Sequence, residues 1–147
     1  MTMPPAERPS LTEYLFHTPL TTRWSDNDIY GHINNVTYYS YFDTAANLYL
    51  IEVGGLDIAN AATIGLVVES HCTYHAPLSY PTPLVAGLRV DRLGNRAVTY
   101  GIAIFAEGEE LAAAHGHFVH VFVDRASRRP APIPQALRDA LARLVTS

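Results

Sequence analysis

The chain contains no lysine and only one cysteine, and both absences limit what the protein can be. All ten basic residues are arginine, and fourteen acidic residues give a formal net charge of −4. Broad nucleic-acid binding needs a positively charged face, so we expect no nucleic-acid partner. The lone Cys72 cannot form an intrachain disulfide, and its place in an alternating apolar segment predicts a buried, unreactive thiol.

Long hydrophobic runs are also missing. No apolar run approaches the roughly 20 residues that cross a membrane, and the start, Met1-Thr2-Met3-Pro4-Pro5, lacks the regions of a signal peptide. A chain of 147 residues fits one domain that can bury a core without disulfides or metal. We therefore expect a single domain over residues 1–147, located in the cytoplasm without a membrane partner, with residues 1–14 as a loose N-terminal segment.

Residues 36–53 predict one long helix. This segment contains no proline or glycine, and its apolar residues surround it almost completely, so we expect the helix to be mostly buried. Asn34 or Asn35 is the expected N-cap because an asparagine side chain can accept from the first unpaired N–H groups. The pair Gly54-Gly55 supplies the expected left-handed stop.

Most of the remaining chain predicts a sheet. Alternating or apolar segments predict strands over residues 18–24, 66–75, 84–93, 96–106 and 111–123. Gly94-Asn95 predicts a two-residue hairpin with glycine first, and residues 135–144 predict a short amphipathic helix. This pattern indicates an α+β fold, an antiparallel sheet of about five to six strands wrapped on one long central helix. Such a sheet leaves edge strands uncovered, so we expect a homo-oligomer.

A polar loop runs directly into the predicted helix. It contains the strings Trp24-Ser25-Asp26-Asn27-Asp28 and Gly31-His32-Ile33-Asn34-Asn35. If residues 36–53 are helical, these groups lie at a helix N-terminus, where unpaired N–H groups and the macrodipole stabilise negative charge. A carboxylate beside such donors is the combination that attack on a carbonyl needs, with one group as base or nucleophile and the other holding the oxyanion.

These two strings, followed by Tyr38, Tyr41 and Phe42, resemble the hot-dog fold acyl-CoA thioesterases of the 4-hydroxybenzoyl-CoA thioesterase-like family. The resemblance covers roughly residues 15–145. It implies a homodimer or homotetramer with acyl-CoA bound in a cleft between subunits. It also implies a hydrolase that cleaves an acyl thioester to a carboxylic acid and free coenzyme A, with no cofactor besides the coenzyme A of the substrate.

The resemblance also assigns roles within the loop. The second aspartate of the family motif is the catalytic carboxylate, which corresponds to Asp28. The peptide N–H at the start of the helix polarises the thioester carbonyl, and it corresponds to Asn35. Some relatives carry histidine at that position, and many carry a Gly-Asp pair where this chain has Pro81-Thr82.

Several roles stay open on the residues alone. Asp28 either attacks the carbonyl to give an anhydride or activates a water, and the alternative is a turn cap, common for aspartate in glycine-containing loops. Asp26 is the weaker acid candidate, and we expect it to bond the loop backbone. His32 either hydrogen-bonds to Asp28 and orients water, or holds the loop in place through its ring.

Further residues are predicted to contact the substrate. They are Tyr30, Gly31, Asn34, Tyr38, Arg128 and Arg129. Gly31 is expected to adopt a backbone conformation that a Cβ would obstruct. Arg128 and Arg129 suit the phosphates of coenzyme A, since guanidinium groups match phosphate oxygens, although a solvated charged turn is the commoner explanation of such a cluster. Tyr38 either narrows the cleft or belongs to the core.

Seven histidines raise the question of a metal site. The strings His115-Gly116-His117 and His71-Cys72-Thr73-Tyr74-His75 each place two rings on one face of a strand. No paired cysteines or His-Glu motif completes a ligand set, so we predict no metal.

Two other functions remain as alternatives. The first is an acyl-thioester dehydratase or hydratase of the same fold; such enzymes resemble one another in an Asp and a His five positions apart, whereas Asp28 and His32 are four apart. The second is a non-catalytic acyl-CoA-binding protein, which would be stabilised by acyl-CoA without releasing a thiol.

Overall fold

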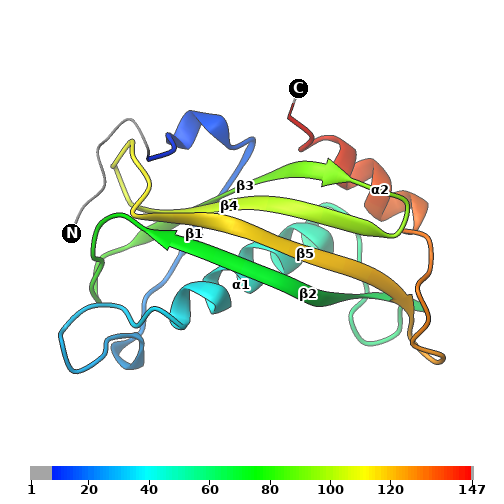
Figure 1. Cartoon of the computed structure of the whole chain (residues 1–147), viewed down its shortest axis with the longest axis horizontal. Coiled ribbons are helices and arrows are strands. Elements are labelled where there is room, and N and C mark those ends of the chain that lie inside the picture. The colour runs from blue at the N-terminus through cyan, green and yellow to red at the C-terminus, as the bar shows by residue number, and fades with distance from the viewer. Residues whose placement is uncertain (1–7, 147) are drawn as a thin grey trace.

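The computed structural model describes residues 8–146 and shows one antiparallel sheet with a long helix against one face (Figure 1). The elements in chain order are the 3-10 helix η2 Leu11–Glu13, β1 Phe16–Leu20, the 3-10 helix η3 Trp24–Asp26, α1 Thr37–Glu52, β2 Thr63–Tyr74, β3 Leu84–Leu93, β4 Ala97–Ala106, β5 Ala114–Asp124 and α2 Gln135–Ala142. The strand order is β1-β3-β4-β5-β2. This arrangement confirms the predicted α+β hot-dog fold.

Helix α1 buries one face rather than most of its surface. Its buried residues are Tyr38, Tyr41, Phe42, Ala45, Ala46, Tyr49 and Leu50. They recur three and four positions apart, which places them on one stripe that packs into the sheet. Apolar side chains on other faces, such as Ile51, are exposed. The prediction of a mostly buried helix is therefore wrong for the single chain, because the sheet covers the helix from one side only.

The ends of α1 follow the prediction in part. The N-cap is Val36, and no side chain caps it. Asn34 acts two residues earlier instead, because its Oδ1 accepts from the Val36 N–H at 3.2 Å. The prediction of Asn34 or Asn35 as the N-cap is thus wrong in position. At the other end Gly55 has φ 73°, which confirms the predicted left-handed stop.

Two other local predictions are wrong. β1 ends at Leu20, and the chain then makes the turn η3, because the Asp26 carboxylate accepts from the Arg23 N–H and closes that turn. Alternation across residues 18–24 did not reveal this local side-chain bond. The β3–β4 turn lies one residue later than predicted, since Leu93 pairs with Val98 and the Gly94 N–H donates to the Ala97 carbonyl, which leaves Asn95 and Arg96 at the tip.

The described part of the N-terminal segment is ordered, which contradicts the prediction for residues 8–14. The Arg8 guanidinium donates to the Ala112 carbonyl, and the Ala112 N–H donates to the Pro9 carbonyl, both at 2.9 Å. Tyr14 is buried against Gly87, where a Cβ would lie only 2.8 Å from the ring. The segment covers apolar side chains on the outer face of the sheet, a long-range contact without a local sequence signal. Residues 1–7 lie outside the described residues.

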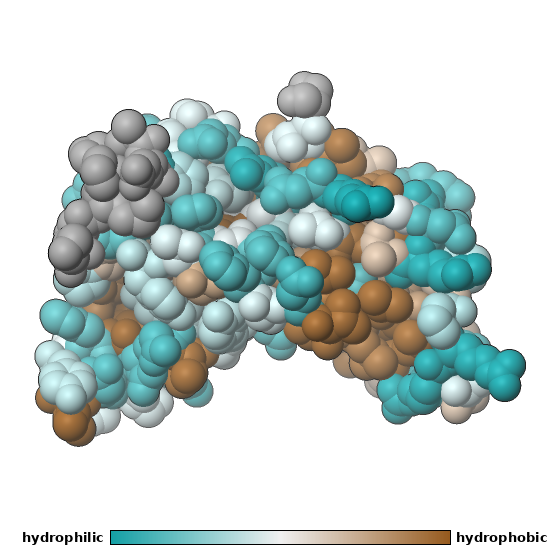
Figure 2. Space-filling view, in the orientation of Figure 1, coloured by the Kyte–Doolittle hydropathy of each residue, from teal (hydrophilic) through white to brown (hydrophobic). Residues whose placement is uncertain are grey.

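Strand β2 forms one edge of the sheet. Leu66, Val67 and Val68 are 39%, 46% and 60% exposed, and a bulge between Val67 and Glu69 shifts the pairing with β5. Figure 2 shows apolar surface gathered around the N-terminal half of this strand. A long apolar edge without proline or lysine is open to pairing with another strand. Within residues 8–146, no helix is long and apolar enough to cross a membrane.

Candidate active site

The loop before α1 folds back on itself as a small hairpin. At its base the Asn34 N–H donates to the Asp26 carbonyl, and nearer its tip the Asp28 N–H donates to the His32 carbonyl, both at 2.9 Å. The Gly31 N–H closes the turn by donating to the Asp28 carbonyl at 3.1 Å. Gly31 has φ 81°, so a residue with a Cβ would be strained there, as the sequence predicts.

A second loop holds this hairpin in place. The Ile33 N–H donates to the Leu78 carbonyl, and the Ser79 hydroxyl donates to the Gly31 carbonyl, both at 2.8 Å. The Tyr80 N–H donates to the Asn27 side chain at 3.0 Å. Residues 78–80 belong to a loop that contains Pro77, Pro81 and Pro83. Its structural role is to fix the loop that carries Asp28.

Asp28 has one engaged and one open carboxylate oxygen. Oδ1 accepts from the Tyr30 N–H at 2.8 Å, whereas Oδ2 makes no hydrogen bond with the described residues. The carboxylate therefore caps a turn, which was the structural alternative, and still presents an oxygen for chemistry. Asp28 is partly buried and lines a hollow of about 500 Å³. The other lining residues are Trp24, Ser25, Asn27, Ile29 and Gly31.

Asn35 offers an unbonded N–H at the start of α1. Its carbonyl accepts from the Tyr74 hydroxyl at 2.9 Å, but its N–H has no partner among residues 8–146. Because the N–H groups at this end of α1 carry partial positive charge, an oxygen placed here would be stabilised as negative charge develops. Asn35 lines a cavity of about 330 Å³. The other lining residues are His32, Ile33, Tyr38, Tyr74, His75, Ala76 and Pro77.

One chain leaves this site open. Gly31 lines the Asp28 hollow and the next residue, His32, lines the Asn35 cavity, but the two have no lining residue in common. Three large side chains around the loop are almost fully exposed, with Trp24 at 81%, Ile29 at 92% and Tyr30 at 80%. Exposed apolar groups clustered on one loop are typical of a surface that another molecule covers.

The structure also places the other predicted loop residues. Of the roles left open for His32, a ring hydrogen bond to Asp28 is absent: the two residues bond through their main chains, and the ring has no hydrogen-bond partner among the described residues. Tyr38 lines the Asn35 cavity, and its ring contacts that of Tyr74 edge-on at 5.1 Å between centroids. Burial raises the pKa of Tyr38 to about 12, so its hydroxyl stays protonated. Tyr30 lies at the exposed tip of the loop and lines neither the Asn35 cavity nor the Asp28 hollow.

Arg128 and Arg129 are not near Asn35 within one chain. Tyr74 pairs with Ala114, and Thr63 pairs with Asp124 at the other end of the same ladder. Ten residues of extended strand measure roughly 33 Å, so the arginine turn lies at the far end of the sheet from the Asn35 cavity. The structure therefore separates these two predicted groups unless a second chain brings them together.

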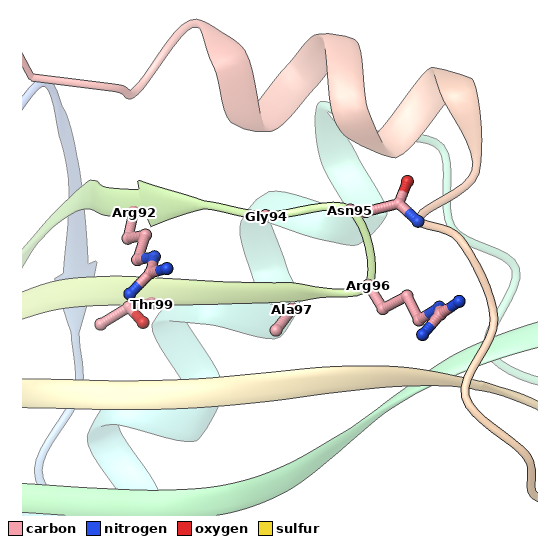
Figure 3. A pocket seen from close by; sticks show the side chains of 6 residues that line it. All are labelled: Arg92, Gly94, Asn95, Arg96, Ala97 and Thr99. Atoms are coloured by element: carbon pink, nitrogen blue, oxygen red, sulfur yellow. The ribbon is translucent and has the colours of Figure 1, made fainter.

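The far end of the sheet carries further arginines that the sequence analysis missed. Figure 3 shows Arg92 beside Thr99, with Asn95 and Arg96 at the turn of the β3–β4 hairpin, around a hollow of about 450 Å³. Among the described residues, the guanidinium groups of Arg92, Arg96, Arg128 and Arg129 have no hydrogen-bond or ion-pair partner. We call these four side chains the arginine end. The arginines that flank Gly94 were the available sequence signal.

The histidines and the cysteine lie elsewhere. His71 stacks on His117, and His75 hydrogen-bonds to His115 at 2.6 Å, on the outer face of β2 and β5. Within residues 8–146, no three or more His, Cys, Asp or Glu side chains are grouped to hold a metal ion. Burial raises the pKa of the Cys72 thiol to about 11, which makes it a poor nucleophile.

The family of the chain follows from a comparison with known sequence families. The model of the Thioesterase-like superfamily matches residues 22–141, which include the Asp28 loop, α1 and strands β2 to β5. The chain belongs to this superfamily. Membership confirms the resemblance noted in the sequence, and it leaves the roles of individual residues to be tested.

Members of known structure share the fold of this thioesterase-like chain. It is similar to the PA5185 protein from Pseudomonas aeruginosa strain PAO1, with 60% identity, a TM-score of 0.94, and coverage of 95% of this chain and 98% of that one. It also shares the fold of Slr0204, a 1,4-dihydroxy-2-naphthoyl-CoA thioesterase from Synechocystis, with 20% identity and a TM-score of 0.76. The match covers 88% of this chain and 96% of that one. A stretch of 63 residues is 30% identical to YsmA of Bacillus subtilis and spans 43% of this chain and 42% of YsmA.

Proposed function

We propose that the protein is an acyl-CoA thioesterase that hydrolyses an acyl thioester to a carboxylic acid and free coenzyme A. The observation that carries this proposal is that one loop holds two groups without a hydrogen-bond partner among residues 8–146, the Asn35 N–H at the start of α1 and the Oδ2 of Asp28. A donor at a helix N-terminus and a carboxylate are the two groups that thioester hydrolysis needs. Membership in the thioesterase-like superfamily supports the same reaction.

In the proposed reaction the carbonyl oxygen of the thioester accepts a hydrogen bond from the Asn35 N–H. Negative charge develops on this oxygen as the carbonyl carbon is attacked. Asp28 acts in one of two ways. Its Oδ2 bonds to the carbonyl carbon and the C–S bond breaks, giving a mixed anhydride and a coenzyme A thiolate that takes a proton, after which water hydrolyses the anhydride. Alternatively, Asp28 takes a proton from a water that attacks directly. Neither route uses a metal or prosthetic group.

We propose that the active form is a homodimer joined through β2. This strand is an edge of twelve residues with exposed Leu66, Val67 and Val68 at its centre. Antiparallel pairing of two β2 strands about that centre would place the Thr63 end of one chain beside the Tyr74 end of the other. Since Thr63 pairs with Asp124, the arginine end of one chain would then lie near the Asn35 cavity of the other.

The dimer gives the arginine end a role in the proposed reaction. Unpaired guanidinium groups bind phosphate oxygens well, and coenzyme A carries phosphates at the end distant from its sulfur. Arg128 and Arg129 would therefore hold the nucleotide part of the substrate whose thioester lies in the other chain. A location in the cytoplasm is part of this proposal and stays a prediction.

A change of Asp28→Asn tests the chemistry. Hydrolysis, measured as thiol release from a series of acyl-CoA thioesters of graded length, should fall about 10²- to 10⁴-fold. The rise in Tm caused by acyl-CoA should persist, because the amide keeps the shape of the side chain. The matched control is Asp43→Asn on the exposed face of α1, which should hydrolyse at the parental rate.

Other outcomes favour the alternatives. Parental hydrolysis by Asp28→Asn would show that this carboxylate is not the catalytic group. A parent protein that acyl-CoA stabilises without any thiol release would be a binding protein. Conversion between enoyl and 3-hydroxyacyl thioesters, followed by ultraviolet absorbance, would identify a dehydratase or hydratase.

A further inference from the structure

Asp26 is a buried carboxylate two residues before Asp28, with an exposed fraction of only 1%. Its Oδ2 accepts from the Tyr41 hydroxyl at 2.7 Å and from the Arg23 N–H at 2.9 Å, and its Oδ1 accepts from the Arg23 guanidinium at 3.2 Å. Burial alone would raise the pKa of Asp26, but these hydrogen bonds outweigh it and hold the pKa below its ordinary value. Asp26 is therefore an ionised group whose acceptor positions are filled by the protein.

The main chain of Asp26 reaches the helix start. Its carbonyl accepts from the Asn34 N–H at 2.9 Å, and the Asn34 carbonyl accepts from the Thr37 N–H at 2.9 Å. Asn34 is thus held through both its N–H and its carbonyl, and that carbonyl belongs to the same peptide as the Asn35 N–H. Tyr41 lies on the buried face of α1, so its bond to Asp26 connects the body of the helix to the loop at its N-terminus. We call these contacts of Arg23, Asp26, Tyr41 and Asn34 the Asp26 network.

We infer that Asp26 and Tyr41 are positioning residues for the proposed hydrolysis, because the Asp26 network directs the Asn35 N–H into its cavity. This inference rests on the proposed function. Neither residue lines the Asn35 cavity or the Asp28 hollow, so they act through the peptide that they hold. An oxyanion donor has to lie about 2.7–3.1 Å from the oxygen, and a displacement of about 1 Å can reduce the rate by about 10².

The change Tyr41→Phe tests this inference against a closely matched control. Tyr49 lies on the same buried face of α1, and its hydroxyl donates to the Ala140 carbonyl at 2.6 Å, on the side of α2. Each change removes one buried hydroxyl and its hydrogen bond. We expect Tyr41→Phe to lower kcat about 10-fold with KM changed less than about 2-fold, and Tyr49→Phe to lower Tm by a similar amount while keeping the parental kcat.

A second pair of variants separates positioning from a general loss of structure. Asp26→Asn keeps an oxygen that can accept from Tyr41, whereas Asp26→Ala removes every side-chain contact of the network. We expect kcat to decrease from the parent to Asp26→Asn and further to Asp26→Ala, measured where each variant is fully folded. An equal kcat for Tyr41→Phe and Tyr49→Phe, with equal losses of Tm, would overturn the inference.

Hydrogen exchange gives a readout that does not depend on turnover. The backbone N–H of Asn34 donates to the Asp26 carbonyl. Hydrogen exchange at this N–H should become at least about 10-fold faster in Tyr41→Phe and stay at the parental rate in Tyr49→Phe. If the parent hydrolyses no acyl-CoA while Asn34 exchange still responds to Tyr41→Phe, the proposed function fails and the positioning of this peptide stands. If Asn34 exchange is the same in both variants, the Asp26 network does not position the peptide.

Discussion

The Tyr74 hydroxyl donates to the Asn35 carbonyl at 2.9 Å and so joins the end of β2 to the start of α1. Burial, as the largest cause, raises the pKa of Tyr74 above its ordinary value, so the hydroxyl is a protonated donor throughout the physiological range. The protein thereby occupies the carbonyl of Asn35, while its N–H has no hydrogen-bond partner among residues 8–146. The edge strand and the helix N-terminus together present this donor.

Replacing Tyr74 with phenylalanine should weaken catalysis. Tyr74→Phe removes the hydroxyl and leaves the ring, so we expect kcat to fall about 5- to 20-fold and the free energy of unfolding to fall by about 1 kcal/mol. Tyr39→Phe is the control, because the Tyr39 hydroxyl has no hydrogen-bond partner among the described residues. Steady-state kinetics and urea unfolding of both variants provide the measurement. A parental kcat in Tyr74→Phe would show that this bond does not orient the Asn35 peptide.

The local part of the site was predictable from the sequence. Asp28, Gly31 and Asn35 lie within one short loop, and their order along the chain already places them before a helix whose pattern and glycine stop are clear. The left-handed φ of Gly31 and the position of the Asn35 N–H follow from that order. The order of residues along the chain places both features in the loop, whereas the contacts of Tyr41 and Tyr74 that fix the Asn35 peptide come from farther away.

Long-range contacts were not predictable in the same way. Tyr74 bonds to a residue 39 positions away, and nothing in the alternation of β2 identifies that partner. The packing of Tyr14 on Gly87 was likewise not predictable, because the two residues are far apart in the sequence. The separation of Arg128 from Asn35 appeared only when the register of β2 and β5 fixed which ends of the sheet each occupies.

Charge at the arginine end should govern substrate affinity rather than turnover. The double change Arg128→Ala with Arg129→Ala should raise KM for acyl-CoA about 10-fold and leave kcat within about 2-fold, because phosphate contacts bind substrate and transition state equally. Added salt should raise the KM of the parent and affect the double variant less. Arg143→Ala removes an exposed charge after α2 and should leave KM unchanged. A KM unaffected by the double change would mean that these arginines form a solvated turn.

Acid should destabilise the protein through a buried histidine. Burial lowers the pKa of His120 to about 4, and its Nδ1 lies 3.1 Å from the Tyr100 hydroxyl. Below about pH 6.5 this histidine binds a proton in the unfolded chain but stays neutral in the folded chain. Its contribution to the free energy of unfolding is therefore complete above about pH 6.5 and is lost as the pH falls toward about 4. The free energy of unfolding should decrease by about 2 to 3 kcal/mol between about pH 7 and about pH 4.5.

The change His120→Gln separates this histidine from the others. Glutamine can still bond to Tyr100 but does not titrate, so urea unfolding at several pH values should show a shallower decrease than in the parent. His75 and His115, whose pKa values burial also lowers, should account for part of the remaining decrease. His17→Gln, at an exposed position, should reproduce the parental pH dependence. The same decrease in His120→Gln as in the parent would exclude His120 as the cause.

A charge at the centre of β2 should separate the proposed dimer. Val68 is 60% exposed on the edge strand, and a two-fold axis near it would bring the two copies of this side chain together. Val68→Lys would place like charges opposite each other across the pairing, which destabilises adjacent strands. Light scattering should then report a monomer, and KM for acyl-CoA should rise by at least about 10-fold, because each site would lack the arginine end of the other chain.

The control for this change is Val145→Lys, which adds the same charge at a position 43% exposed and away from β2. It should keep both the dimer and the activity. A Val68→Lys protein that stays dimeric and active would place the interface on another surface. A Val68→Lys monomer with parental kcat and KM would show that one chain completes its own site, and the open hollow beside Asp28 would then receive the substrate without a second subunit.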